Sequence, residues 1–262
     1  MADYVKPKKH LGQHFLTDKA VARAIVDAID PSTENLIEIG AGTGVLTQYI
    51  LERKIPNFKI IEIDTESVNY LLSHFENMNA HVIEADFLHF KLETIFPDSF
   101  SLIGNFPYNI SNQILFKAYD YRQQVTEVVG MFQKEVAERI ASKPGSKKYG
   151  ILSVLLQAYY DIEYLFTVNE DVFNPPPKVK SGVIRLRRND IEKLDCDEAL
   201  FKTVIKTAFN QRRKTLGNAL KSMGAKEWPE EYKVILSKRA EQLGVADFVL
   251  LTNLVVQTIH RK

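Results

Sequence analysis

The sequence predicts an α/β fold with a mostly parallel sheet, followed by a small all-helical C-terminal domain. Short apolar runs recur along the first 190 residues, and helical stretches separate several of them, which is typical of β–α–β units. After residue 190 the strand pattern stops and helical periodicity continues. We therefore expect one domain over residues 1–190, with a flexible basic N-terminal arm at Lys6, Lys8 and Lys9, and a second, helical domain over residues 191–262.

The first predicted element is a helix over residues 18–30, with Thr17 or Asp18 as its N-cap. Its apolar residues fall on one helical face, at Val21, Ala22, Ile25 and Ile29. The later apolar runs are short, and several end in glycine or polar residues, as buried strands do. They predict strands over residues 36–39, 58–63, 81–85, 100–104, 125–131 and 181–187.

The composition is that of an ordinary globular protein, with 45% hydrophobic and 26% charged residues. The single cysteine, Cys196, excludes an internal disulfide framework and fits a reducing compartment. The chain has no apolar run of the roughly 18 residues that cross a bilayer, and its N-terminus lacks the apolar stretch of a signal peptide. We therefore expect a cytoplasmic protein without a membrane partner.

The charges are distributed unevenly, although the formal net charge is only +1. Residues 191–262 carry 13 Lys and Arg against 9 Asp and Glu, whereas the rest of the chain carries 21 against 24. Such an asymmetry predicts that the C-terminal part faces a polyanion. A solvated helical surface is the alternative interpretation.

A glycine-rich loop at Gly40, Gly42 and Gly44 follows a predicted strand and precedes a helix. Glycine lets a backbone turn tightly and approach a ligand closely. The spacing Gly-x-Gly-x-Gly departs from the dinucleotide fingerprint, so it disfavours NAD. Glu62 ends the next strand and could accept hydrogen bonds from ribose hydroxyls, and Asp86 ends a third strand at the same edge. A nucleotide-type cofactor is predicted, with a merely structural turn as the alternative.

The run Asn105-Phe106-Pro107-Tyr108 follows the predicted strand at 100–104 and carries the most specific chemical signal. The exocyclic amine of adenine is a poor nucleophile, because its lone pair is delocalised into the ring. Asn105 could accept one amine N–H with its side-chain oxygen, and the backbone before Pro107 could accept the other. The Tyr108 ring could stack on the base, which is worth about 1–3 kcal/mol. An ordinary β-turn is the alternative.

A base that is processed in this way must be single-stranded or flipped out of its helix. A second aromatic side chain is then expected on its other face. Phe173 is the candidate, and the alternative is that Phe173 is a core residue.

The glycine loop, Glu62 and Asp86 resemble the S-adenosylmethionine pocket of class I methyltransferases, which have a Rossmann-like fold. This resemblance implies that the loop at Gly40 and Gly42 passes the methionine portion of the cofactor. It also implies that Glu62 holds the ribose and that Asp86 faces the cofactor adenine.

Five segments together resemble the small-subunit (16S) ribosomal RNA adenine dimethyltransferases: residues 9–16, 38–47, 105–111, 173–183 and 209–216. The resemblance covers nearly the whole chain. It implies transfer of four methyl groups from S-adenosyl-L-methionine to two adjacent adenosines. These lie in a hairpin loop near the 3′ end of the rRNA, and the reaction occurs late in assembly of the small ribosomal subunit. We expect a monomer without a metal ion.

The resemblance also implies roles for individual residues. His14, where the family often has asparagine, and Leu16 would contact the cofactor through their backbones. Asn105 would hold the target amine beside the cofactor. The target base would be surrounded by Pro107, Tyr108 and Phe173. Phosphates of the rRNA would be bound by Arg212, Arg213 and Lys214, for which a solvated helical face is the alternative.

Three other functions remain open on the sequence alone. The macrolide-resistance enzymes that methylate large-subunit rRNA share the glycine loop and the Asn-x-Pro-Tyr motif. The segment 209–216 and the triple proline at 175–177 favour the small-subunit enzymes. A DNA adenine methyltransferase would need a larger target-recognition domain. A mainly non-catalytic assembly factor is disfavoured by the intact Asn105 and the intact loop.

Overall fold

The computed structural model describes residues 4–260 and divides the chain into two compact units. The first unit extends to residue 138 and resumes at 161–188, and the second combines residues 139–160 with the chain from 189 onward. The expected boundary at residue 190 placed residues 139–160 with the sheet. They belong to the second unit because helix α6 (Ile151–Gln157) packs with α7 (Glu198–Asn210) and α10 (Val245–Ile259).

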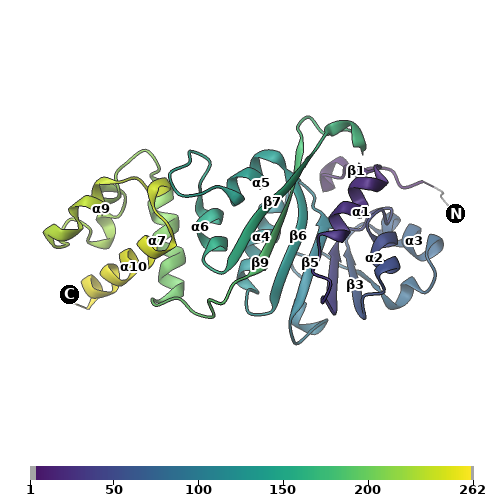
Figure 1. Cartoon of the computed structure of the whole chain (residues 1–262), viewed down its shortest axis with the longest axis horizontal. Coiled ribbons are helices and arrows are strands. Elements are labelled where there is room, and N and C mark those ends of the chain that lie inside the picture. Colours follow the sequence, from purple (N-terminus) through teal and green to yellow (C-terminus); the bar gives the residue numbers. More distant parts are fainter. Residues whose placement is uncertain (1–3, 261–262) are drawn as a thin grey trace. The chain divides into compact units, whose positions relative to one another are not determined.

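The first unit is built on a seven-stranded sheet with the order β4-β3-β2-β5-β6-β9-β7 (Figure 1). Strands β2 to β6 pair in parallel, and β9 joins β6 in the antiparallel direction. A separate two-stranded ribbon pairs β1 with β8. The strands are β1 (Phe15–Leu16), β2 (Asn35–Ile39), β3 (Asn57–Glu62), β4 (Val82–Glu84), β5 (Phe100–Asn105), β6 (Val125–Gln133), β7 (Tyr160–Val168), β8 (Phe173–Asn174) and β9 (Ser181–Arg188).

The six predicted strands are confirmed, and each lies within two residues of its expected bounds. The predicted first helix is α1 (Lys19–Asp27), and Asp18 caps it by accepting from the backbone N–H groups of Ala20 and Val21. The other helices of this unit are α2 (Thr47–Arg53), α3 (Thr65–His74), α4 (Ser111–Asp120) and α5 (Lys134–Ala141), which continues into the second unit. No helix within residues 4–260 is both long enough and apolar enough to span a membrane.

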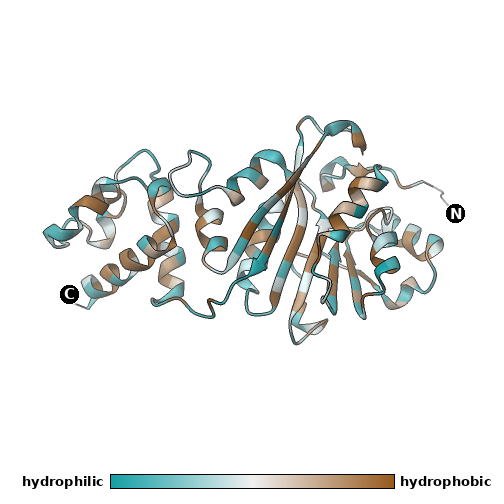
Figure 2. Cartoon of the chain, in the orientation of Figure 1, coloured by the Kyte–Doolittle hydropathy of each residue, from teal (hydrophilic) through white to brown (hydrophobic). Residues whose placement is uncertain are grey.

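Alternating side chains of the strands divide the core between two faces of the sheet. Leu36, Ile60 and Ile103 pack in one hydrophobic cluster with α1 and α2. Intervening residues such as Ile37 and Leu102 are equally buried and lie on the opposite face. Because right-handed crossovers run in opposite directions from β2, α4 covers that second face. Figure 2 shows the resulting hydrophobic stretches along the strands.

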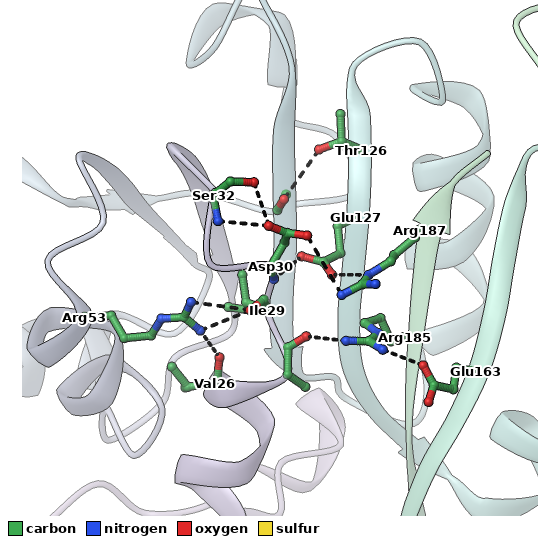
Figure 3. A network of polar contacts seen from close by, with 12 residues as sticks. Val26, Ile29, Asp30, Ser32, Arg53, Thr126, Glu127, Glu163, Arg185 and Arg187 are labelled. Atoms are coloured by element: carbon green, nitrogen blue, oxygen red, sulfur yellow. Dashed lines mark hydrogen bonds and ion pairs between the residues drawn. The ribbon is translucent and has the colours of Figure 1, made fainter. Parts of the chain in front are cut away.

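Arginine side chains fasten the C-terminal end of α1 to the surrounding elements (Figure 3). Arg53 donates to the carbonyl oxygens of Val26, at 2.6 Å, and Ile29, and Arg185 of β9 donates to that of Ala28 at 3.2 Å. The Val26 oxygen also accepts from the Ile29 backbone N–H at 3.2 Å, and a guanidinium complements the negative end of the helix dipole. The antiparallel strand β9 is thereby held against the parallel part of the sheet.

The second unit is helical apart from the start of β7. It comprises α6, α7, α8 (Leu216–Ala219), α9 (Lys233–Ser237), α10 and short 3-10 turns. Its core contains an aromatic cluster: the rings of Phe209 and Phe248 stack with centroids 6.0 Å apart, and Tyr149 lies 6.4 Å from Phe209. Helix α10 is predominantly hydrophobic (Figure 2), and Phe248, Leu251, Leu254 and Val255 are buried in this core.

A carboxyl group is fully buried inside the first unit. Glu38 of β2 is 1% exposed, and its Oε2 accepts a hydrogen bond of 2.7 Å from the Thr47 hydroxyl. Burial, together with the nearby Glu62 carboxylate, raises the pKa of Glu38 to about 8, although the hydrogen bond from Thr47 opposes the rise. Near neutral pH the folded protein therefore keeps a proton on Glu38 that the unfolded chain has already released.

This proton linkage makes stability depend on pH in a defined window. Between about pH 4.5 and pH 8 the folded state binds more protons than the unfolded state, so the free energy of unfolding falls as pH rises. The slope that Glu38 adds is up to about 1.4 kcal/mol per pH unit. We expect Glu38→Gln to remove this slope in denaturant unfolding series between pH 5 and pH 8. Glu34→Gln, at an exposed position of the same segment, should retain it.

Candidate active site

The glycine loop after β2 has the backbone geometry that only glycine adopts without strain. Gly40, Gly42 and Gly44 have φ angles of 69°, 56° and 78°. A Cβ at Gly40 would protrude into the cavity at this edge, with the Pro107 ring 3.9 Å away as its one neighbour within 4 Å. A Cβ at Gly42 would lie 2.8 Å from the Phe15 ring. The loop therefore leaves an open cradle at Gly40, whereas the absence of a side chain at Gly42 makes room for the Phe15 ring.

Glu62 ties this loop to the end of β3. Its carboxylate accepts hydrogen bonds of 2.9 Å from the backbone N–H groups of Gly42 and Asp64, and the residue is 3% exposed. Burial raises the pKa of Glu62, while the two N–H donors oppose the rise. A carboxylate offers about four acceptor positions, so two remain for a ligand in the cavity that Glu62 lines.

Asp86 lies beyond β4 and shapes a short loop at the same edge. Its two carboxylate oxygens accept hydrogen bonds from the Leu88 backbone N–H at 2.8 Å and the His89 ring at 2.7 Å. Ala85, Asp86, Phe87 and Leu88 line the cavity next to Glu62. The three predicted cofactor positions, the glycine loop, Glu62 and Asp86, thus lie around one cavity.

The turn after β5 is fixed by the Phe106 side chain, which is 1% exposed. Phe106 occupies the space beside two glycines of neighbouring strands. A Cβ at Gly104 would come within 2.6 Å of its ring, and a Cβ at Gly130 would overlap it. The ring also packs edge-on against Phe132, with centroids 5.0 Å apart. Asn105 on one side of this anchor and Pro107 on the other are thereby turned toward the cavity that they line.

A hydrogen bond to the N-terminal segment orients the Asn105 amide. Its Nδ2 donates to the His14 carbonyl oxygen at 2.9 Å, which leaves Oδ1 as the acceptor that faces away from this bond. The His14 ring donates from Nδ1 to the Pro175 carbonyl at 2.7 Å and stacks on Tyr108, with ring centroids 5.5 Å apart. His14 therefore contacts both Asn105 and Tyr108.

The Tyr108 ring is held at its hydroxyl end. A hydrogen bond of 2.5 Å joins the Tyr108 hydroxyl to that of Ser181, which is fully buried at the start of β9. Burial raises the pKa of Tyr108, so its hydroxyl stays protonated and available for this bond. Sequence reasoning missed Ser181, because a serine in a strand carries no signal of its partner.

The segment 8–14 crosses the cavity edge and is fastened near Glu62. Lys8 forms an ion pair with Asp64, whose side chain is buried, and Gln13 donates to the same carboxylate at 3.0 Å. Gln13 also accepts from the Lys8 backbone N–H at 2.7 Å, which closes the segment into a loop. The basic N-terminal residue Lys8 thus has a defined partner. Asp64 was not expected from the sequence.

Two expected site residues lie outside the cavity lining. Phe173 is 4% exposed, pairs with Leu16 across the β1–β8 ribbon and packs in the hydrophobic cluster of the sheet. Leu16 is 3% exposed in the same cluster. Because the Phe173 ring has little open surface, its burial favours the core interpretation that the sequence left open.

The basic run Arg212, Arg213 and Lys214 follows α7 in the second unit. All three residues are exposed, but Arg212 also donates to the carbonyl oxygens of Lys147 and, at 3.2 Å, Tyr149. Arg212 therefore fastens the loop before α6, whereas Arg213 and Lys214 extend from the turn. The described residues contain no group of three His, Cys, Asp or Glu side chains arranged for a metal ion.

This arrangement fits a ligand that combines a ribose, a base and a flexible polar chain. The open cradle at Gly40 leaves space for the chain, and Glu62 has acceptor positions for two hydroxyls. The Asp86 loop offers a carboxylate at the other end of the cavity. Asn105 presents an amide oxygen where a second substrate would enter.

Comparisons with known proteins agree with this geometry. The family model for ribosomal RNA adenine dimethylase matches residues 5–257. The chain is 57% identical to the ribosomal RNA small subunit methyltransferase A of Cytophaga hutchinsonii over 253 residues, which cover 96% of this chain and 98% of that protein.

Solved structures show the same fold. A dimethyladenosine transferase from Plasmodium falciparum superposes with a TM-score of 0.73 at 25% identity and covers 93% of this chain and 98% of its own. The 23S rRNA methyltransferase ErmE gives a TM-score of 0.61 at 22% identity, with 90% of this chain and 99% of its own covered. The match over nearly the whole length shows that this chain belongs to the ribosomal RNA adenine dimethylase family.

Proposed function

We propose that this protein dimethylates the exocyclic amines of two adjacent adenosines in a hairpin loop near the 3′ end of small-subunit rRNA, with S-adenosyl-L-methionine as methyl donor. The observation that carries the proposal is the position of Asn105, whose amide oxygen lies beside the cavity built by the glycine loop and Glu62. High identity to small-subunit methyltransferases over nearly the full chain supports the choice of rRNA.

The cofactor would be held by the predicted positions that line the cavity. The loop at Gly40 and Gly42 would pass its methionine portion, for which Gly40 leaves room, Glu62 would accept from the ribose hydroxyls, and the loop at Asp86 would border the adenine. Bound there, the cofactor supplies an electrophilic methyl group on a sulfonium. His14 lies at the junction of the two substrates, because its backbone orients Asn105 and its ring covers Tyr108.

The chain's own contribution to chemistry is to hold the target amine. Asn105 Oδ1 accepts one N–H of the amine, and the Phe106 carbonyl before Pro107 accepts the other. These two acceptors favour a pyramidal nitrogen whose lone pair points at the methyl group. Reacting atoms held about 3 Å apart supply a large part of the rate enhancement. The methylated nitrogen is acidic and releases its proton to water, so no strong base is required.

The target base must leave its stack to reach this turn, and Tyr108 supplies the face on which it stacks. Exposed Arg213 and Lys214 contact rRNA phosphates, and Arg212 supports them by bonding to the backbone at Lys147. The reaction accompanies assembly of the small ribosomal subunit in the cytoplasm. A single chain carries all the described residues of the site, so the proposal needs no second copy.

One experiment separates the proposal from two alternatives, a large-subunit rRNA methyltransferase and a non-catalytic assembly factor. The likeness to a 23S rRNA methyltransferase concerns the fold alone at 22% identity. Protein and labelled S-adenosylmethionine are incubated with unmethylated small subunits, large subunits, naked rRNA or DNA. Dimethyladenosine in small subunits supports the proposal, and label confined to large subunits contradicts it. Cofactor binding without any label favours a non-catalytic assembly factor.

Removal of the Asn105 amide should abolish most of the activity. Asn105→Ala loses an acceptor that is aligned with the developing charge, and loss of one such preorganised group costs about 100-fold or more in rate. The rate is measured by single-turnover methylation of small subunits. Asn112→Ala, an exposed asparagine of α4, should retain the full rate. A fully active Asn105→Ala would disprove the assigned role.

The hydrogen bond between Tyr108 and Ser181 should orient the ring for base stacking. Tyr108→Phe and Ser181→Ala each remove one partner, and each should raise the KM for the RNA by about 3- to 10-fold. The double variant should be no worse than either single variant, because both lose the same bond. Ser101→Ala, a buried serine in β5, should combine additively with Tyr108→Phe. Additive effects of Ser181→Ala would contradict the interpretation.

A further inference from the structure

Lys117 of α4 uses its ammonium group to hold a backbone loop. The Nζ donates to the carbonyl oxygens of Phe87, at 2.5 Å, and Leu88, at 3.3 Å, and also to that of Phe90. An ammonium has three N–H donors, so this loop accepts every one of them. No sequence motif pointed to Lys117, since a lysine on an amphipathic helix is usually solvated.

The loop that Lys117 holds is the one that shapes the far end of the cofactor cavity. Its first residue, Asp86, accepts from the Leu88 backbone N–H and the His89 ring, which folds the loop from within. Lys117 fixes the loop from the other side through its carbonyl groups. Asp86, Phe87 and Leu88 line the cavity, whereas Lys117 does not.

The surroundings of Lys117 favour a fixed position for its charge. The ammonium lies 4.9 Å from the centre of the Phe87 ring and 5.7 Å from that of Tyr121. The Tyr121 hydroxyl donates to Glu93 at 2.6 Å. Burial lowers the pKa of Lys117, and the carboxylates of Asp86 and Glu93 oppose this. A partly desolvated lysine costs free energy, and the three carbonyl contacts offset that cost.

We propose that Lys117 is a positioning residue for cofactor recognition, which holds the 86–90 loop so that the Asp86 carboxylate faces the amine of the cofactor's purine. This inference rests on the proposed function. The hydrogen bonds from the Leu88 N–H and the His89 ring set the direction of the Asp86 carboxylate, and the lysine holds the loop backbone in place. Recognition of the 6-amino group over a 6-oxo group therefore depends on Lys117.

The test compares two ligands by calorimetric titration. S-adenosylhomocysteine carries the 6-amino group, and S-inosylhomocysteine carries a 6-oxo group that a carboxylate repels. We expect Lys117→Met to weaken S-adenosylhomocysteine binding about 10-fold and S-inosylhomocysteine binding less than about 2-fold, which corresponds to loss of about one charged hydrogen bond. The preference of the wild-type protein for the adenosyl ligand should therefore collapse.

A matched control separates this role from general destabilisation. Lys59 of β3 also donates to a backbone carbonyl, that of Ala80 at 2.6 Å, away from the cavity lining. Lys59→Met should keep the full preference. Equal weakening of both ligands in Lys117→Met, or an unchanged preference, would overturn the inference.

Lys117→Arg provides a second variant that keeps the positive charge if the methionine variant does not fold. A planar guanidinium cannot meet three carbonyl groups in the same way, so the preference should fall by about 3-fold. An unchanged preference in Lys117→Arg would contradict the three-donor geometry. Failure of the wild-type protein to bind either ligand would instead disprove the proposed cofactor and, with it, this inference.

Discussion

The buried carboxylate of Glu62 is the interaction on which the candidate site depends. It receives the backbone N–H of Gly42 and that of Asp64, so it joins the glycine loop to the start of α3. Asp64 in turn binds Lys8 and Gln13, which places the N-terminal segment along the cavity. That segment then orients Asn105 through the His14 carbonyl. The neighbouring carboxylates of Glu62 and Asp64 therefore link the N-terminal segment, the glycine loop and the end of β3.

The turn from Asn105 to Tyr108 is held rigid by close packing rather than by charge. Phe106 fills a space that exists because Gly104 and Gly130 have no side chains, and it packs on Phe132. Close packing of this kind leaves one arrangement for the backbone. Asn105 and Tyr108 flank that anchor, and each has a second restraint, from His14 and Ser181 respectively. Methylation of the target amine needs no strong base, so the rate depends on how well these groups hold the amine in position.

The sequence predicted those parts of the molecule that depend on local pattern. Six strands follow from their apolar runs, and Asp18 is a local cap for α1. Strand β7 was missed because no glycine or turn signal separates it from α6. For Phe173 the sequence left two interpretations open, because its burial depends on pairing with Leu16, more than 150 residues earlier. Ser181, Asp64 and Lys117 act through partners that are distant in sequence, and no single-sequence pattern reveals such contacts.

The second unit is assembled from two separate stretches of the chain, residues 139–160 and 189 onward. During synthesis, α6 emerges well before α7 and α10, the helices with which it packs. The intervening residues 161–188 must meanwhile return to the sheet to add β7 and β9. The sheet can therefore be completed before α10 has been synthesised. The first unit would then fold on the ribosome before the second. A single cut near residue 190 would separate α6 from its partners rather than release two intact pieces.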